Sequence, residues 1–251
     1  MNILLTVAYE GTNYCGWQRQ ANGVSVQQRL EDTLAALTGV SVRLTGASRT
    51  DAGVHALGQR AGFKIEELKI PVEKLPRVIN ARLPGDIAVC KAEYVPDTFN
   101  ARYDAKRKTY RYVYNNAQYP NPLLRNFSWH VPQRLDIVKM EHAAQCLIGR
   151  HDFTAFCASH GSARSHVREI YAADIKEEPD LVTLTVTGSG FLYNMVRIIA
   201  GTLMYVGTGK LMPFSSQPAL WDVEKALRSR DRTLAGKTAP PQGLVLLEVT
   251  Y

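Results

Sequence analysis

Short apolar runs typical of strands alternate with helix-like segments along the whole 251-residue chain, and this alternation constrains the fold more than any other feature. The first half predicts strands at residues 3–9, 40–44, 61–65 and 87–94 and helices at about 26–37 and 72–81. A similar order recurs after residue 105, with strands at 110–115, 171–175, 181–186 and 244–251 and helices at about 138–148, 196–205 and 222–228. The pattern therefore predicts an α+β fold built from two related halves.

The connection between these halves, residues 97–106, is short and contains neither Pro nor Gly. Such a segment differs in composition from a flexible linker between independent domains. We therefore expect an N-terminal half over 1–105 and a C-terminal half over 106–251 that share one sheet.

The composition is that of a globular protein, with 45% hydrophobic and 21% charged residues. A formal net charge of +7 and a pI of about 9.2 favour a polyanionic partner, and nucleic acid is the first to consider. The chain lacks the signals of a helix-turn-helix, a zinc finger or a basic zipper, so DNA is not the expected partner. It also lacks a basic leader and a long apolar segment, which predicts a cytoplasmic protein without a membrane span.

Four cysteines are scattered without CxxC spacing, which predicts reduced, structural thiols rather than a zinc site or a disulfide framework. One local exception is Cys157, which is followed by His160 and His166. These three side chains lack an evident fourth ligand, and no metal is expected.

A single carboxylate stands in a loop of small residues between two predicted strands. Asp51 is the only acidic residue from position 33 to position 65, although four cations share that stretch: Arg43, Arg49, Arg60 and Lys64. A protein that only held a polyanion would lose affinity by placing a negative charge there. Asp51 is thus a candidate catalytic residue. The alternative is that it caps a turn or pairs with Arg49.

Cations and tyrosines interleave over residues 102–114, the pattern of a surface for single-stranded RNA, where phosphates bind the cations and bases stack on the rings. On a strand, Tyr110, Tyr112 and Tyr114 share one face and Arg111 points away from it. The alternative is that these tyrosines are ordinary, half-buried residues of a sheet.

A strongly apolar helix predicted after Gly190 contains one cation, Arg197. If Arg197 faces the core, it needs a carboxylate to offset its desolvation, and Asp51 is a candidate. Alternatively its side chain reaches solvent or a carbonyl along the helix.

Six segments, taken together and in this order, resemble the TruA-type tRNA pseudouridine synthases. They are YEGTNYCGWQ at 9–18, SRTDAGVH at 48–55, LPGDI at 83–87, KTYRY at 108–112, MVR at 195–197 and APPQGL at 239–244. The resemblance implies the pseudouridine synthase fold, in which two similar halves share a central, mixed but mainly antiparallel sheet flanked by helices. It also implies isomerisation of uridine to pseudouridine at positions 38–40 of the tRNA anticodon stem-loop, by a homodimer without cofactor.

The same resemblance implies roles for four residues. Asp51 matches the essential aspartate, and Arg197 matches the arginine that pairs with it. Tyr110 matches the tyrosine that stacks on the target uracil, and Arg49 matches the arginine beside the flipped nucleotide. The resemblance leaves open whether Asp51 reacts at C1′, removes the C2′ proton or attacks the uracil ring.

Two other classes of protein use the same features. A non-catalytic RNA-binding protein would use the basic, tyrosine-rich surface and would not need Asp51. A nucleoside-processing hydrolase would cleave the glycosidic bond with the same aspartate and release free uracil.

Overall fold

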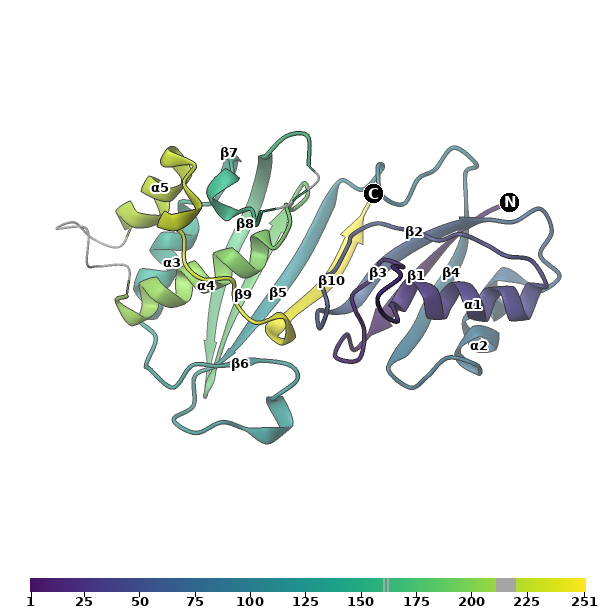
Figure 1. Ribbon diagram of the computed structural model, residues 1–251, viewed down its shortest axis with the longest axis horizontal. Coiled ribbons are helices and arrows are strands. Elements are labelled where there is room, and N and C mark those ends of the chain that lie inside the picture. Colours follow the sequence, from purple (N-terminus) through teal and green to yellow (C-terminus); the bar gives the residue numbers. More distant parts are fainter. Residues whose placement is uncertain (160, 162, 211–219) are drawn as a thin grey trace. The chain divides into compact units, whose positions relative to one another are not determined.

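The computed structural model describes residues 1–159, 161, 163–210 and 220–251. It divides into two compact units, one formed by residues 1–106 with 245–251 and the other by residues 107–244 (Figure 1). The expected division at residue 105 assigns the closing strand to the second half, whereas its residues from Val245 onward belong to the first unit. The reason is strand pairing, because this strand lies parallel to a strand of the first unit.

The sheet of the first unit is built around β1 (Asn2–Tyr9), which lies antiparallel to β3 (His55–Lys64) and to β4 (Ile87–Val95). A short strand, β2 (Thr45–Gly46), pairs with β3, and β10 (Leu244–Thr250) runs parallel to β3. Three side chains of β1, those of Ile3, Leu5 and Val7, are fully buried. This strand therefore carries much of the unit's core.

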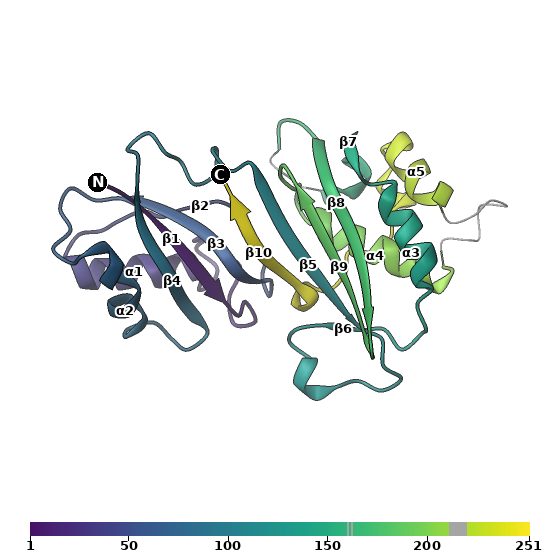
Figure 2. The same cartoon turned by 180° about the vertical axis from the view of Figure 1, so that it is seen from behind.

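Two helices cover this sheet, α1 (Val26–Thr38) and α2 (Leu75–Asn80), the second preceded by a 3-10 turn at Val72–Lys74. Ser25 caps α1, because its side chain accepts a hydrogen bond from the backbone N–H of Gln28 at 3.2 Å. In both ribbon views α1 and α2 lie side by side, with α2 next to β4 (Figures 1 and 2). The predicted helices are thus confirmed.

In the second unit, β9 (Leu181–Gly188) lies between β5 (Arg107–Asn115) and β8 (Val167–Glu178), and β7 (Gly149–Asp152) follows at the edge. These neighbours are all antiparallel, while the two-residue strand β6 (Trp129–His130) is parallel to β5. The helices are α3 (Ile137–Gln145), α4 (Met195–Thr208) and α5 (Leu220–Ser229). Short 3-10 turns span Pro122–Leu124, Thr154–Phe156, Arg232–Leu234 and Pro241–Gly243.

The α+β class and the mainly antiparallel, mixed strand pairing are confirmed. Over the described part of the chain, no helix has the length and apolar character needed to cross a membrane.

One predicted strand, at residues 40–44, is wrong, and the strand predicted from Ala61 begins earlier, at His55. Leu44 forms no strand because its backbone N–H and carbonyl are bound by side chains of α1. Residues 55–59 have weak strand propensity, but β1 pairs with them on one side and β10 reaches their first two residues on the other. Tertiary contacts decide both cases.

The predicted face of β5 is confirmed, since Tyr110, Tyr112 and Tyr114 are only 5%, 0% and 0% exposed. The hydroxyl of Tyr112 donates to the carbonyl of Pro240 at 2.9 Å, and that of Tyr114 to the carbonyl of Ala200 at 2.8 Å. The interpretation as an RNA-stacking surface is therefore wrong for Tyr112 and Tyr114, which belong to the core of the second unit.

The segment that follows α5 packs closely against α4 because Gly201 leaves room for it. A Cβ atom on Gly201 would lie 1.7 Å from the carbonyl oxygen of Lys237. Beside it, the backbone N–H of Gly236 donates to the hydroxyl of Thr202 at 2.8 Å. Residues 236–239 are thereby held along the helix.

We predict that Gly201→Ala destabilises the protein. Alanine normally favours a helix over glycine by about 1 kcal/mol, but here the methyl group forces the Lys237 backbone to move. We expect the free energy of unfolding, measured by urea denaturation, to fall by about 1–3 kcal/mol. Gly85→Ala is the control, because a Cβ there would meet nothing within 4 Å. Equal stability of the two variants would contradict the prediction.

Candidate functional site

Asp51 opens a tight turn in the loop between β2 and β3. Its carbonyl accepts a hydrogen bond from the backbone N–H of Val54 at 3.1 Å, and Gly53 adopts the positive φ of 78° that this turn requires. Asp51 is half-buried, whereas Arg49 is exposed. The backbone of Asp51 thus takes part in a turn, and the role of its side chain stays a prediction.

The segment from Tyr9 to Trp17, at the end of β1 and before α1, holds this loop in place by hydrogen bonds. The hydroxyl groups of Tyr9 and Thr50 are hydrogen-bonded at 2.7 Å, and both side chains are buried. The backbone N–H of Trp17 donates to the carbonyl of Thr50 at 3.0 Å. The backbone N–H of Gly11 donates to Nδ1 of the buried His55 at 3.0 Å, so this nitrogen is the acceptor. Three hydrogen bonds thus fix the residues on either side of Asp51.

Glycines allow this close approach. A Cβ atom on Gly11 would lie 2.0 Å from the carbonyl oxygen of Val54. At Gly16, where φ is 103°, it would lie 2.6 Å from the carbonyl oxygen of Thr50. Only glycine tolerates both the contact and the backbone conformation at Gly16. The two glycines of the YEGTNYCGWQ segment therefore have a structural function at the loop.

Asp86 anchors the other side of this segment. Its carboxylate accepts a hydrogen bond from the hydroxyl of Tyr14 at 2.5 Å and another from the side chain of Asn13 at 3.2 Å. Its carbonyl accepts from the backbone N–H of Glu10 at 2.9 Å. Burial, followed by the hydrogen bond to Asp86, raises the pKa of Tyr14 well above its usual value, so that its hydroxyl remains a donor. The LPGDI segment thus supports the segment that supports Asp51.

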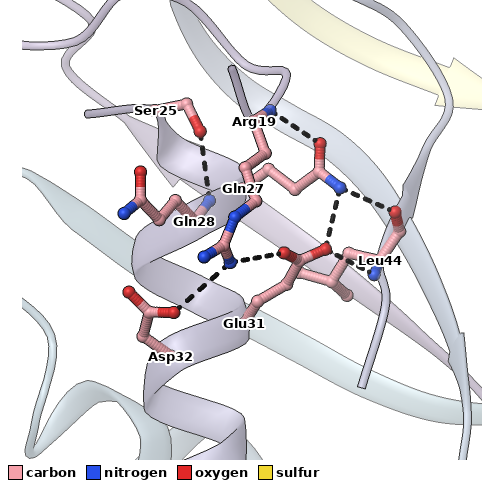
Figure 3. A network of polar contacts seen from close by, with 7 residues as sticks. All are labelled: Arg19, Ser25, Gln27, Gln28, Glu31, Asp32 and Leu44. Carbon is pink, nitrogen blue, oxygen red and sulfur yellow. Dashed lines mark hydrogen bonds and ion pairs between the residues drawn. The ribbon is translucent and has the colours of Figure 1, made fainter. Parts of the chain in front are cut away.

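A network of polar side chains joins α1 to the chain just before the loop (Figure 3). The buried carboxylate of Glu31 accepts hydrogen bonds from the backbone N–H of Leu44 at 2.9 Å, from Gln27 at 2.8 Å and from Arg19 at 3.1 Å. Gln27 also donates to the carbonyl of Leu44 at 3.0 Å. A buried carboxylate with three donors is well compensated for its desolvation. The network therefore fixes where the chain enters the loop.

In the second unit, Arg197 is held in place by its neighbours. Its Nε donates to the carbonyl of Ala239 at 2.8 Å, and one of its terminal nitrogens donates to Oδ1 of Asn194 at 2.8 Å. The backbone N–H of Ala239 in turn donates to the carbonyl of Arg197 at 3.0 Å. Arg197 thus binds a carbonyl outside α4 rather than one along the helix, and its expected pairing with Asp51 stays a prediction.

Asn194 has an unusual backbone conformation at the start of α4, with a φ of 59°. Asparagine is one of the few residues with a side chain that enter this left-handed region readily. Its side chain also holds Arg197. One residue thus sets both the start of the helix and the direction of the arginine.

Tyr110 lies beside Phe191, with the two rings edge to face and their centroids 5.2 Å apart. Its neighbour Tyr112 packs on the APPQGL segment, where a Cβ on Gly243 would come within 2.6 Å of the tyrosine ring. The KTYRY and APPQGL segments are therefore packed together, and the second of them also binds Arg197.

The four predicted site residues thus divide between the two units. Arg49 and Asp51 share one loop of the first unit, and Tyr110 and Arg197 lie on β5 and α4 of the second. Sequence reasoning assigned no role to Tyr9, Thr50, His55 and Asn194, although the first three stand in segments that it had singled out and Asn194 directly precedes one.

The Cys157 tract shows no metal site within the part of the chain that the structure describes. Burial raises the pKa of the Cys157 thiol, which disfavours the thiolate form that binds metals. His166 is hydrogen-bonded to the hydroxyl of Thr154 at 2.9 Å. His160 lies outside the described residues.

Comparison with known proteins gives consistent matches along the whole chain. A family model described as tRNA pseudouridine synthase matches residues 5–104 and 143–251. The chain is 49% identical over 250 residues to tRNA pseudouridine synthase A of Thermoanaerobacter pseudethanolicus, covering 100% of this chain and 99% of the relative. It is 48% identical over 249 residues to tRNA pseudouridine synthase A of Geotalea uraniireducens, covering 99% of each chain.

We predict that Asn194→Ala lowers the free energy of unfolding more than Asn194→Gly does. Both variants remove the acceptor for Arg197, but only alanine resists the φ of 59°, at a cost of about 1–2 kcal/mol. Urea denaturation of the two variants measures this difference directly. If both lose the same stability, the backbone conformation is not what asparagine provides at this position.

Proposed function

Because the chain belongs to the tRNA pseudouridine synthase family, we propose that it isomerises uridine to pseudouridine at positions 38–40 of the anticodon stem-loop of tRNAs, with Asp51 as the catalytic residue. The observation that carries this proposal is the loop of Asp51. Its neighbours on both sides are fixed by buried hydrogen bonds, and its own carboxylate is half-buried. A carboxylate that reacts with one particular atom must be held in the right geometry, and a rigid backbone provides this.

The reaction breaks the bond between N1 and C1′, turns the uracil and forms a bond between C5 and C1′. A proton leaves C5 and N1 gains one, so the overall change is an isomerisation without net oxidation or reduction. An ionised Asp51 can begin it by attacking C1′, by removing the C2′ proton to give a glycal, or by attacking the uracil ring. All three routes need the carboxylate ionised.

Three further residues complete the proposal. Tyr110 stacks on the detached uracil, and its phenol accepts the C5 proton directly or through a relay. Arg197 pairs with Asp51 and keeps it ionised. Arg49 occupies the space that the flipped nucleotide leaves, because a uridine within a stem must leave the stack to react. The hydrogen bonds of Arg197 to Ala239 and Asn194, which limit its freedom, support such a positioning role.

The proposed division of labour follows the two halves of the chain. The N-terminal half supplies the reacting Asp51 with Arg49, and the C-terminal half supplies Tyr110 and Arg197. The basic character of the chain, with a net charge of +7, supports tRNA as the partner. A homodimer in the cytoplasm is part of the proposal, and the family resemblance supports it.

We predict that Asp51→Asn abolishes pseudouridine formation and keeps tRNA binding. The amide is nearly the same size as the carboxylate but is neither a nucleophile nor a base. Pseudouridine in an unmodified tRNA transcript is mapped by carbodiimide treatment and primer extension, and binding is measured in parallel. Asp174→Asn, at an exposed position of β8, is the matched control and is expected to act like the wild type.

The outcomes separate the alternatives. Equal modification by wild type and Asp51→Asn overturns the site assignment. Tight binding without modification by either protein favours an RNA-binding protein. Release of free uracil by the wild type identifies a hydrolase instead of an isomerase.

We predict that Tyr110→Phe retains tRNA binding but slows turnover by about 10²-fold, because the ring still stacks while the proton acceptor is lost. Release of tritium from tRNA labelled at C5 of uridine measures this step. The control is Tyr114→Phe, which removes the hydroxyl of a buried tyrosine on the same face of β5. Tritium release at the wild-type rate from Tyr110→Phe would exclude its phenol as the acceptor.

A further inference from the structure

A buried pair of hydroxyl groups includes the residue that precedes Asp51 in the chain. Thr50 precedes Asp51 in the chain, and its Oγ1 lies 2.7 Å from the hydroxyl oxygen of Tyr9. The two side chains are 7% and 5% exposed, so water does not readily replace either partner. The ring of Tyr9 is itself held in place by Trp17, with the ring centroids 5.9 Å apart.

The backbone of Thr50 is held from the same side. Its carbonyl accepts the hydrogen bond of the Trp17 backbone N–H, and it lies so close to Gly16 that a Cβ atom there would come within 2.6 Å of its oxygen. Side chain and carbonyl of Thr50 are therefore both bound to one segment, residues 9–17. Since the Thr50 carbonyl belongs to the peptide group that joins it to Asp51, these contacts set the direction in which the Asp51 side chain leaves the chain.

We propose that Tyr9 and Thr50 are positioning residues for Asp51, acting through their hydroxyl–hydroxyl hydrogen bond. Neither residue needs to touch the substrate in this role. The proposal rests on the proposed function of Asp51 and extends it to residues in the core behind the loop. It assigns a catalytic consequence to a hydrogen bond that would otherwise be a detail of packing.

The chain after Asp51 is held by contacts other than those that hold the chain before it. The Val54 N–H closes the turn onto the carbonyl of Asp51, and the neighbouring His55 is bound by Gly11. The loop is thus held after Asp51 by a second, independent set of contacts. Loss of the Tyr9–Thr50 hydrogen bond loosens the backbone before Asp51, while the backbone after Asp51 stays fixed. The Asp51 carboxylate then changes direction, but the loop does not unfold.

The test is a double-mutant cycle on single-turnover pseudouridine formation. Tyr9→Phe and Thr50→Val each remove one hydroxyl and keep the shape of the side chain. Because a displacement of 1 Å at a reacting group can cost about 10²-fold in rate, we expect each variant to lower kcat by about 10-fold or more, with KM near the wild-type value. The double variant is expected to be no slower than the slower single variant, since both remove the same hydrogen bond.

Two controls separate positioning from loss of stability. Tyr114→Phe removes another buried tyrosine hydroxyl, which donates to the carbonyl of Ala200, and is expected to lose similar stability while kcat stays unchanged. Thr50→Ser keeps the hydroxyl and is expected to retain most of the wild-type kcat. An equal fall in kcat in Tyr114→Phe, or additive effects of Tyr9→Phe and Thr50→Val, would overturn the proposal.

A second readout keeps the proposal testable apart from the activity. We expect Tyr9→Phe to speed amide hydrogen exchange at Trp17, whose N–H binds the carbonyl of Thr50, while exchange at Val54 stays at the wild-type rate. If Asp51→Asn is inactive but Tyr9→Phe has wild-type kcat, the proposed function stands and this inference fails. If the wild type itself is inactive on tRNA, the proposed function fails, and unchanged exchange at Trp17 in Tyr9→Phe would overturn the inference as well.

Discussion

The close packing of the segment 9–17 against the loop of Asp51 is the constraint on which the candidate site depends. Two glycines bring backbone against backbone, and the hydrogen bonds of Tyr9, Gly11 and Trp17 then fix residues 50 and 55. Because protein interiors are close-packed, a loop held in this way has few alternative conformations. The position of one carboxylate is thereby set by residues that precede it by some forty positions in the chain.

Two carboxylates extend this support in two directions. Toward α1, Glu31 accepts three hydrogen bonds and ties the helix to Leu44, where the chain approaches the loop. Toward β4, Asp86 binds the side chains of Tyr14 and Asn13. The carboxylate of Glu31 is buried and its three donors offset the cost of its desolvation, whereas that of Asp86 is half-buried. Networks of this kind favour one arrangement over its near alternatives.

The second unit follows the same principle with different residues. Gly201 admits the backbone of Lys237 against α4, which brings Ala239 to Arg197, while Asn194 holds the same guanidinium from the start of the helix. Tyr112 is used in the core, where its hydroxyl binds Pro240. Tyr112, which the sequence pattern grouped with the candidate site residues, thus serves the packing of the core, while Arg197 is a proposed site residue.

The sequence alone determined the α+β class, most helices and strands, the shared face of Tyr110, Tyr112 and Tyr114, and the family to which the chain belongs, because apolar periodicity and short motifs are local properties. It did not determine that residues 40–44 lack a strand or that Tyr9 and Thr50 form a buried pair, because both depend on which distant groups satisfy a hydrogen bond. It also could not tell a stacking tyrosine from a core tyrosine, since burial on β5 is decided by the segment that packs on it. Local pattern sets the elements, and only tertiary packing decides which polar groups meet.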